Sequence, residues 1–298
     1  MARCVNGERV LTEVQLLAVD APPGRLIFLG TPGSGKSTVV VERAIRLGRS
    51  GAAKPDAVLL LAPSRRAANA LGRSVHERLG AGVGLTATSF HGLALAILRR
   101  HYRDLGYARR PELLSTTRHV HFLRDVLAEE DPALWPHHRG QLRSSALRLL
   151  AYRMVMGMAE NGLDAAELQR RARVWGQVDL EDLAAFAARY RQRLRKAGLV
   201  DFGQLLAGAI ELLSTNRRVV EVYHRTYRHI LVDEFEQASF AHAAIVGNLL
   251  DEGTDLLVAG DPAQATNSFR SGSPSHLLSY PERVGARVVV SCENHRSR

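Results

Sequence analysis

The chain of 298 residues contains little cysteine, few aromatic residues and no long apolar run. Its two cysteines, Cys4 and Cys292, lie at opposite ends and match no metal-ligand spacing, so we expect two reduced thiols rather than a disulfide framework. Without a run of about 18 apolar residues, no transmembrane helix and no membrane partner are expected. The opening residues MARCVNGER lack the apolar core of a signal peptide, which predicts a cytoplasmic protein.

Acidic residues are outnumbered by basic ones. Forty Lys and Arg against thirty Asp and Glu give a formal net charge of +10. A basic balance suits a polyanionic partner, because each neutralised phosphate releases condensed counterions. An arginine-rich composition in a protein without a polyanionic ligand would give the same net charge. Charge alone therefore does not show whether the protein binds a polyanion. The hydrophobic fraction of 46% is that of an ordinary globular protein.

One motif is complete: residues 30–37, GTPGSGKS, fit the phosphate-loop pattern GxxxxGK[ST]. Residues 25–29 before it read as a buried strand, and residues 38–47 after it read as a helix. In this context the backbone N–H groups of the turn would wrap a β-phosphate, Lys36 would hold the β- and γ-phosphate oxygens, and Ser37 would ligate Mg²⁺. The residues predicted to hold the nucleotide are Thr31, Pro32, Gly33, Ser34, Gly35, Lys36, Ser37 and Thr38.

Short apolar runs recur along the chain at residues 26–29, 57–61, 230–232, 256–258 and 288–290. Each run ends in glycine, proline or a polar residue, which is typical of buried parallel strands that lead into loops at their carboxyl ends. Ligands of such sheets bind outside those ends. Helical periodicity dominates from about residue 93 to residue 197. The sequence therefore predicts an α/β domain with a parallel sheet and an inserted all-helical subdomain.

An acidic pair follows the predicted strand at residues 229–232. Asp233 would hold Mg²⁺ through water, and Glu234 would act as general base towards an attacking water. Lys36 and Asp233 are 233 − 36 = 197 residues apart, which favours a motor lobe with an insertion over a small kinase or GTPase. A third strand end, at residues 256–264, offers Gln264 as a sensor of the γ-phosphate. The alternative for its GDP segment is a tight turn.

In this order the segments resemble the first motor lobe of the UvrD/Rep/PcrA group of superfamily 1 DNA helicases. The segments and the family motifs that they resemble are residues 11–19 (Q motif), 30–37 (motif I), 61–71 (motif Ia), 88–92 (motif Ib), 199–206 (the LDFDDLL stretch), 233–237 (motif II), 260–272 (motif III) and 293–297 (motif IV). The resemblance covers nearly the whole chain. It implies a RecA-like phosphate-loop NTPase fold, ATP and Mg²⁺ as cofactors, and single-stranded DNA as a partner.

The resemblance also implies roles for single residues. Gln15 would read adenine, and Arg43 matches a family position near adenine, although an ordinary surface arginine is the alternative there. Arg296 would contact the γ-phosphate together with Gln264. The residues expected to contact single-stranded DNA are Ser64, His91 and Phe269.

Four regions are expected. Residues 1–95 and 199–275 would form the two parts of the RecA-like lobe, residues 96–198 the helical insertion, and residues 276–298 the start of a second lobe that carries motif IV. Family members continue into that second motor lobe. We therefore expect the chain to be a fragment, the product of a truncated gene, or one part of a split complex with a partner subunit.

Two departures from the family pattern leave the function open. Glu236 stands where the family has a glutamine, and Asn267 stands where it has a tyrosine. One hypothesis is the ATP-binding lobe of a DNA helicase or translocase, with 3′-to-5′ movement and a role in DNA repair or recombination implied by the resemblance. The other is a non-hydrolysing nucleotide- or DNA-binding module, or a subunit that supports a partner motor. A third possibility is a nucleotide or metabolite kinase, which would transfer phosphate to a small acceptor without any effect of DNA.

Overall fold

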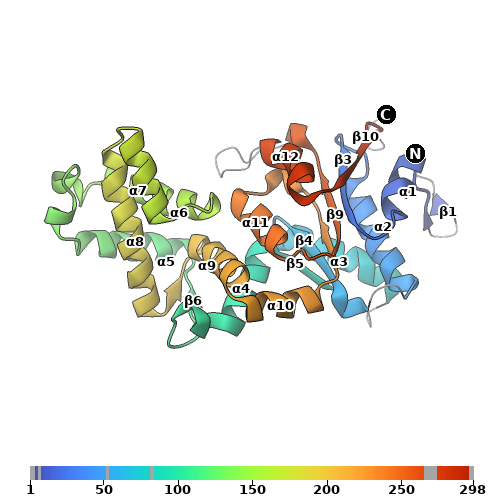
Figure 1. Cartoon of the computed structure of the whole chain (residues 1–298), viewed down its shortest axis with the longest axis horizontal. Coiled ribbons are helices and arrows are strands. Elements are labelled where there is room, and N and C mark those ends of the chain that lie inside the picture. Colours follow the sequence, from blue (N-terminus) through green and yellow to red (C-terminus); the bar gives the residue numbers. More distant parts are fainter. Residues whose placement is uncertain (1–3, 6–7, 52–53, 81–83, 265–273, 295–298) are drawn as a thin grey trace. The chain divides into compact units, whose positions relative to one another are not determined.

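The computed structural model describes residues 4–5, 8–51, 54–80, 84–264 and 274–294. The chain divides into two compact units. The first, which we call the sheet unit, comprises residues 1–93 and 216–298, and the second, the helical unit, comprises residues 94–215 (Figure 1). None of the helices within the described ranges combines the length and the apolar character that crossing a lipid bilayer requires.

A six-stranded sheet forms the centre of the sheet unit. Its strand order is β10-β3-β9-β8-β4-β5, and every neighbouring pair is parallel. The strands are β3 (Arg25–Gly30), β4 (Val58–Ala62), β5 (Thr86–Ser89), β8 (His229–Val232), β9 (Asp255–Gly260) and β10 (Arg287–Ser291). A separate antiparallel pair is formed by β1 (Cys4–Val5) and β2 (Glu8–Arg9). The expected α/β fold of RecA-like type is confirmed.

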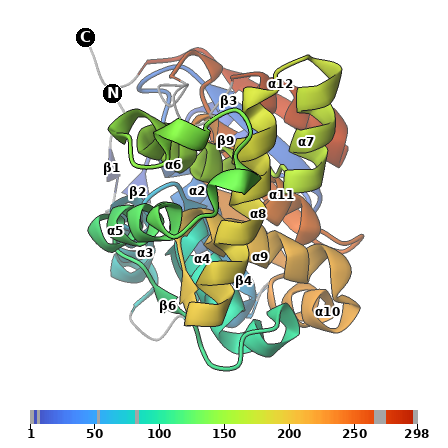
Figure 2. The ribbon, with the colours of Figure 1, turned by 90° about the vertical axis from the view of Figure 1, so that its left-hand side faces the viewer.

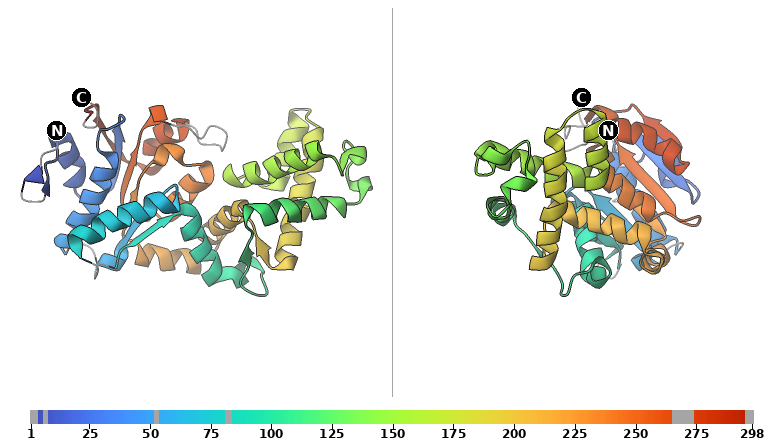
Figure 3. Two further views of the ribbon diagram at one scale, coloured as in Figure 1. Left: turned by 180° about the vertical axis from the view of Figure 1, so that it is seen from behind. Right: turned by 60° about the vertical axis from the view of Figure 1, so that its left-hand side comes forward.

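Helices cover both faces of this sheet (Figure 3). Phe28 and Leu60 point to the face that α1, α2 and α3 cover, while Ile27 and Leu61, one residue along, are buried on the other. Because both faces are buried, the central strands are continuous apolar runs. The helices are α1 (Glu13–Val19), α2 (Lys36–Arg49), α3 (Arg65–Leu79), α10 (Arg217–Thr226), α11 (Phe240–Asn248) and α12 (Pro274–Val284), with short 3-10 turns η1 (Pro55–Ala57), η5 (Phe235–Gln237) and η6 (Pro262–Gln264).

The helical unit is built around its own apolar core, in which Trp135, Phe186 and Tyr190 are fully buried. Helix α4 (Phe90–His101) begins in the sheet unit and ends in the helical unit. Helices α7 and α8 pack side by side (Figure 2). The remaining elements are η2 (Tyr102–Leu105), β6 (Glu112–Leu113), α5 (Thr116–Ala128), η3 (Pro132–Leu134), η4 (Arg139–Gln141), α6 (Ser145–Glu160), α7 (Ala165–Val174), α8 (Asp179–Ala197), β7 (Leu199–Val200) and α9 (Phe202–Thr215).

This division differs from the expected one in two places. Residues 199–215, expected in the sheet-bearing lobe, belong to the helical unit, because α9 packs against α6. The contact is close: a Cβ on Gly203 would lie 2.9 Å from Cβ of Ala159. Residues 276–298 were expected to open a second lobe, but β10 pairs with β3 and forms one edge of the first sheet.

Candidate functional site

The predicted phosphate loop connects β3 to α2 in a tight turn. Gly33 and Gly35 have φ values of +81° and +83°, a conformation that glycine adopts at little cost. Ser34 N donates a hydrogen bond to Thr31 O at 3.1 Å, and a Cβ on Gly30 would lie 2.1 Å from Oγ of Ser34. The glycines therefore allow the loop to fold back over the end of its own strand.

Gln15 supports this loop from α1. Its side chain completes a capping box with Thr12, and Nε2 donates to Ser34 O at 2.8 Å. A Cβ on Gly35 would lie 2.4 Å from the same Nε2 atom, so the amide packs directly against the loop. Gln15 is therefore a buried support of the phosphate loop, while its contact with adenine stays a prediction.

The third strand end also reaches the loop. Lys36 Nζ donates to Gly30 O at 2.9 Å and to Thr31 O at 3.1 Å, and it lies 3.7 Å from Oδ2 of Asp261. Gln264 Nε2 donates to that same Oδ2 atom at 2.8 Å. The GDP segment is thus more than a turn, because it links Gln264 to Lys36. Sequence reasoning missed Asp261, although it directly follows a buried strand.

The acidic pair meets the loop despite its distance along the chain. The side chain of Ser37 and the charge of Lys36 lie close enough to Asp233 to favour its ionised form. Burial nevertheless raises the pKa of Asp233, because the ionised form loses water. Among the described residues, Asp233 Oδ1 has no hydrogen-bond partner. The two halves of the predicted nucleotide site therefore converge.

Glu234 has an unusual backbone. Its φ of +52° makes it the only non-glycine residue with positive φ in the described part of the chain. Such a conformation costs about 1–3 kcal/mol and occurs mainly at functional sites. Gln237 Nε2 donates to Glu234 Oε2 at 3.0 Å. Burial and the charge of Asp233 raise the pKa of Glu234, which suits a carboxylate that accepts a proton.

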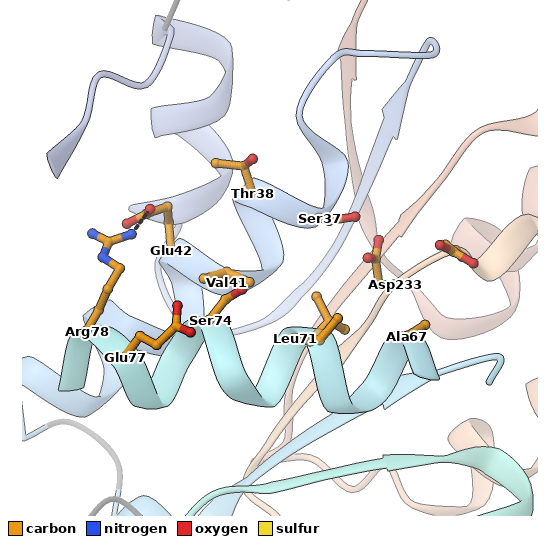
Figure 4. A pocket seen from close by; sticks show the side chains of 12 residues that line it. Ser37, Thr38, Val41, Glu42, Ala67, Leu71, Ser74, Glu77, Arg78 and Asp233 are labelled. Carbon is orange, nitrogen blue, oxygen red and sulfur yellow. Dashed lines mark hydrogen bonds and ion pairs between the residues drawn. The ribbon is translucent and has the colours of Figure 1, made fainter. Parts of the chain in front are cut away.

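A cavity of about 330 Å³ opens beside these groups, between α2 and α3 (Figure 4). Ser37, Asp233 and Glu234 line one end. The ion pair of Glu42 with Arg78 lines the other end, and Thr38 belongs to the wall. The cavity connects the acidic pair to solvent. Such a path is required if water is to reach a general base at this position.

Arg43 has a different role from the one expected. Its guanidinium is buried and donates to the carbonyls of Val19 and Ala21 and to Asp255, with 3.0 Å between Nη2 and Oδ2. Asp255 begins β9, so this ion pair lies at the amino edge of the sheet, opposite the phosphate loop. The placement corrects one expectation: Arg43 is no surface arginine but joins α1, α2 and β9, while its contact with adenine stays a prediction.

The candidate DNA contacts are only partly described. Ser64 is exposed after β4 and caps α3, with its Oγ accepting from Ala67 N at 3.1 Å. His91 is half-buried at the start of α4, just after β5. Both therefore lie at the carboxyl edge of the sheet. Phe269 and Arg296 lie outside the described residues.

The residues present fit a magnesium-bound triphosphate. In the described part of the chain, the buried polar atoms at the carboxyl edge that lack hydrogen-bond partners include Oγ of Ser34 and Oδ1 of Asp233 beside the phosphate loop. No group of three or more His, Cys, Asp and Glu side chains that could hold a metal occurs within the described residues. An ion here would take its protein ligand from the hydroxyl of Ser37 and its other ligands from phosphate and water.

Comparison with known proteins agrees with this geometry. Residues 11–284 match the family model of the UvrD/REP helicase N-terminal domain. The chain belongs to this family. The resemblance of its motifs to UvrD-type helicases is thereby confirmed.

Several curated relatives of this UvrD/REP domain align over almost all of the chain. ATP-dependent DNA helicase PcrA of Bacillus subtilis (strain 168) is 25% identical over 96% of the chain and 38% of its own length. DNA helicase II of Escherichia coli (strain K12) is 24% identical over 96% of the chain and 38% of its own length. DNA helicase IV of the same organism is 29% identical over 92% of the chain and 43% of its own length. The chain thus spans less than half the length of these relatives.

Proposed function

We propose that the chain is the ATP-binding lobe of a UvrD-like DNA helicase or translocase, which hydrolyses ATP in response to single-stranded DNA. One observation carries the proposal: Ser37 of the phosphate loop and the acidic pair Asp233 and Glu234 lie together at one end of a single cavity. The names of the relatives support it, because PcrA is an ATP-dependent DNA helicase. Movement in the 3′-to-5′ direction and a role in DNA repair or recombination belong to the same proposal.

Each polar group of the site has a task in this proposal. The loop amides and Lys36 bind the phosphates, and Ser37 and Asp233 hold Mg²⁺, which when bound neutralises phosphate charge. Glu234 takes the proton of the attacking water, and the amide of Gln237 holds its carboxylate in place. Gln264 senses the γ-phosphate through its bond to Asp261, with Arg296 as a second contact and Gln15 reading adenine.

Single-stranded DNA is proposed to cross the carboxyl edge of the sheet. Ser64 and His91 follow neighbouring parallel strands there, and Phe269 would add an aromatic ring on which a base could stack. A second motor lobe, on the same or another polypeptide, is proposed to complete the ATP site and to permit translocation, because such motors work by opening and closing two lobes.

A second candidate is a non-hydrolysing nucleotide-binding module. It is favoured by Glu236, which is buried where the family pattern has glutamine. Its Oε2 accepts from Asp261 N at 3.1 Å, and burial raises its pKa. An acidic group at the junction of two motifs could weaken the coupling of ATP to DNA.

Hydrolysis assays with a matched pair of variants distinguish these candidates. Glu234→Gln removes the proposed base, and Glu221→Gln changes a half-buried glutamate of α10 as a control. ATP turnover is measured with and without oligo-dT, and ATP binding is measured separately with a fluorescent nucleotide. We expect Glu234→Gln to bind ATP but to lose about 10²–10⁴-fold in turnover. ATP binding without turnover in the wild type and in both variants would favour the module.

A further inference from the structure

Two histidines connect the start of α4 with the start of α11. The ring of His242 stacks on Phe90 at a centroid distance of 4.4 Å, and the ring of His91 meets its edge at 5.6 Å. The start of α4 is held against β5, since a Cβ on Gly92 would lie 2.4 Å from Oγ1 of Thr88. The start of α4 is thus fixed against β5, and there the His91 ring contacts the edge of the His242 ring.

His242 is also fixed to the backbone of its own helix. Ser239 N lies 3.2 Å from Nδ1 of His242, and His242 N donates to Ser239 Oγ, which together form a capping box. Since Nδ1 accepts this bond, the ring proton lies on Nε2. Burial lowers the pKa of His242 to about 3, so the ring is neutral. Its Nε2 is buried and has no hydrogen-bond partner among the described residues.

The capped segment leads directly to the proposed catalytic base. Ser239 follows η5, whose Gln237 donates to Glu234 Oε2 at 3.0 Å. Phe235 of the same turn packs on Tyr280 at 4.7 Å, and the Tyr280 hydroxyl lies 3.5 Å from a carbonyl oxygen of α11. The η5 turn thus contacts Glu234 on one side and is linked to α11 on the other. A displacement at the start of α11 would therefore displace η5.

We infer that His242 is a positioning residue that couples DNA contact at His91 to the nucleotide site beside Glu234 by way of the Ser239 cap and Gln237. The inference rests on the proposed function. A ligand that moves the His91 ring changes its edge contact with His242, and densely packed interiors transmit such displacements. The contacts form a contiguous network, as coupling between two sites requires.

The test measures the coupling between the two ligands in the 298-residue chain. The dissociation constant of a fluorescent ATP analogue is measured with and without saturating oligo-dT, and the ratio is the coupling factor. For the wild type we expect a factor in the range of about 5–150 that is usual for coupled sites, and for His242 variants a factor within about twofold of one. Nucleotide affinity without DNA should be unchanged, which a merely structural role would not predict.

Two substitutions separate the two contacts of His242, the ring contact with Phe90 and the hydrogen bond from Ser239 N. His242→Phe keeps a ring against Phe90 but loses the acceptor for Ser239 N, whereas His242→Gln keeps a capping acceptor but loses the ring. The control is His224→Gln, because the Nε2 atom of His224 lies 2.9 Å from Asn248 O at the other end of α11. The control should retain the wild-type factor. If His242→Phe fails to fold, as thermal unfolding would show, His242→Gln decides.

The outcomes separate the two proposals. A wild type that binds no nucleotide contradicts the proposed function and the inference with it. A wild type that binds nucleotide without any effect of oligo-dT overturns the role of His242 but leaves the nucleotide site intact. Coupling that persists in both His242 variants overturns the inference alone.

Discussion

The sheet unit and the helical unit both bury polar groups, but they use them differently. In the helical unit, Asp182 accepts from the backbone N–H groups of His137 and His138 and from the His138 ring. In the sheet unit, Ser34 Oγ and Asp233 Oδ1 lack partners among the described residues and lie at the carboxyl edge of the sheet. Since buried polar atoms are nearly always paired, unpaired ones at an open edge indicate a ligand.

In the helical unit, three buried polar atoms without hydrogen-bond partners in the described ranges lie near one another. Nε2 of His119 lies 3.5 Å from Oδ2 of Asp201, and the Tyr190 hydroxyl interacts with the same carboxylate. These groups lie in a closed core, where Asp201 also caps α9 through Gln204 N. Their position indicates a role in the fold of the helical unit, because buried polar networks help to specify how a core packs.

The largest expected effect is on the helical unit. Phe186→Ala removes a fully buried ring that packs 5.3 Å from Trp135 and 5.9 Å from Tyr190, measured between centroids. We expect it to destabilise the protein by about 3–5 kcal/mol in urea unfolding. Affinity for a fluorescent nucleotide, measured below the transition, should stay the same. Exposed Leu150→Ala on α6 is the control, and a parallel loss of nucleotide affinity would break the proposed separation of roles.

The reciprocal change is Lys36→Ala in the sheet unit. It removes the charge that is proposed to hold the phosphates, and loss of one partner of a buried charge pair costs about 2–5 kcal/mol, which is roughly 30-fold or more in affinity. Titration with the fluorescent nucleotide measures the loss. Lys196→Ala, an exposed lysine of α8, should bind normally. Equal affinity of the two variants would contradict the proposed nucleotide site.

The sequence predicts the central strands well because their apolar runs are continuous. The runs at residues 26–29, 57–61 and 230–232 correspond to β3, β4 and β8. The edge strand β5 (Thr86–Ser89) escaped prediction, because its TATS sequence is polar and mostly half-buried. The end of the helical unit was also misplaced, since the packing of α9 on α6 depends on a tertiary contact that periodicity does not report.

At the site, motif spacing predicted residues that the structure brings together but not those that orient them. Lys36 and Asp233 follow from the chemistry of a phosphate loop and its acidic partner. Arg43 does not, because its role depends on Asp255, which is 212 positions away in sequence. His242 was missed for the same reason, since it meets His91 across the folded chain, whereas the contact of Gln237 with Glu234 depends on a tight turn that the motif does not report.

The smallest expected effect is a difference in pH dependence between the units. Glu234 can accept a proton only when ionised, so turnover falls as the pH drops through its pKa. Burial and the charge of Asp233 raise that pKa above the usual 4.5, so the acidic limb of the turnover profile should lie above pH 4.5. A limb at or below that pH would contradict the role of Glu234 as general base.

His119 supplies the contrast in the helical unit. Burial lowers its pKa below 6.5, so below pH 6.5 the unfolded chain binds a proton that the folded chain does not. Wild-type stability should therefore fall as the pH is lowered from 6.5, and His119→Gln should remove that part of the dependence in thermal unfolding. The same substitution should leave the acidic limb of turnover where it is. If His119→Gln moved that limb, protonation of His119 in the helical unit would affect the pKa of Glu234 in the sheet unit. The two units would then not be separable in function.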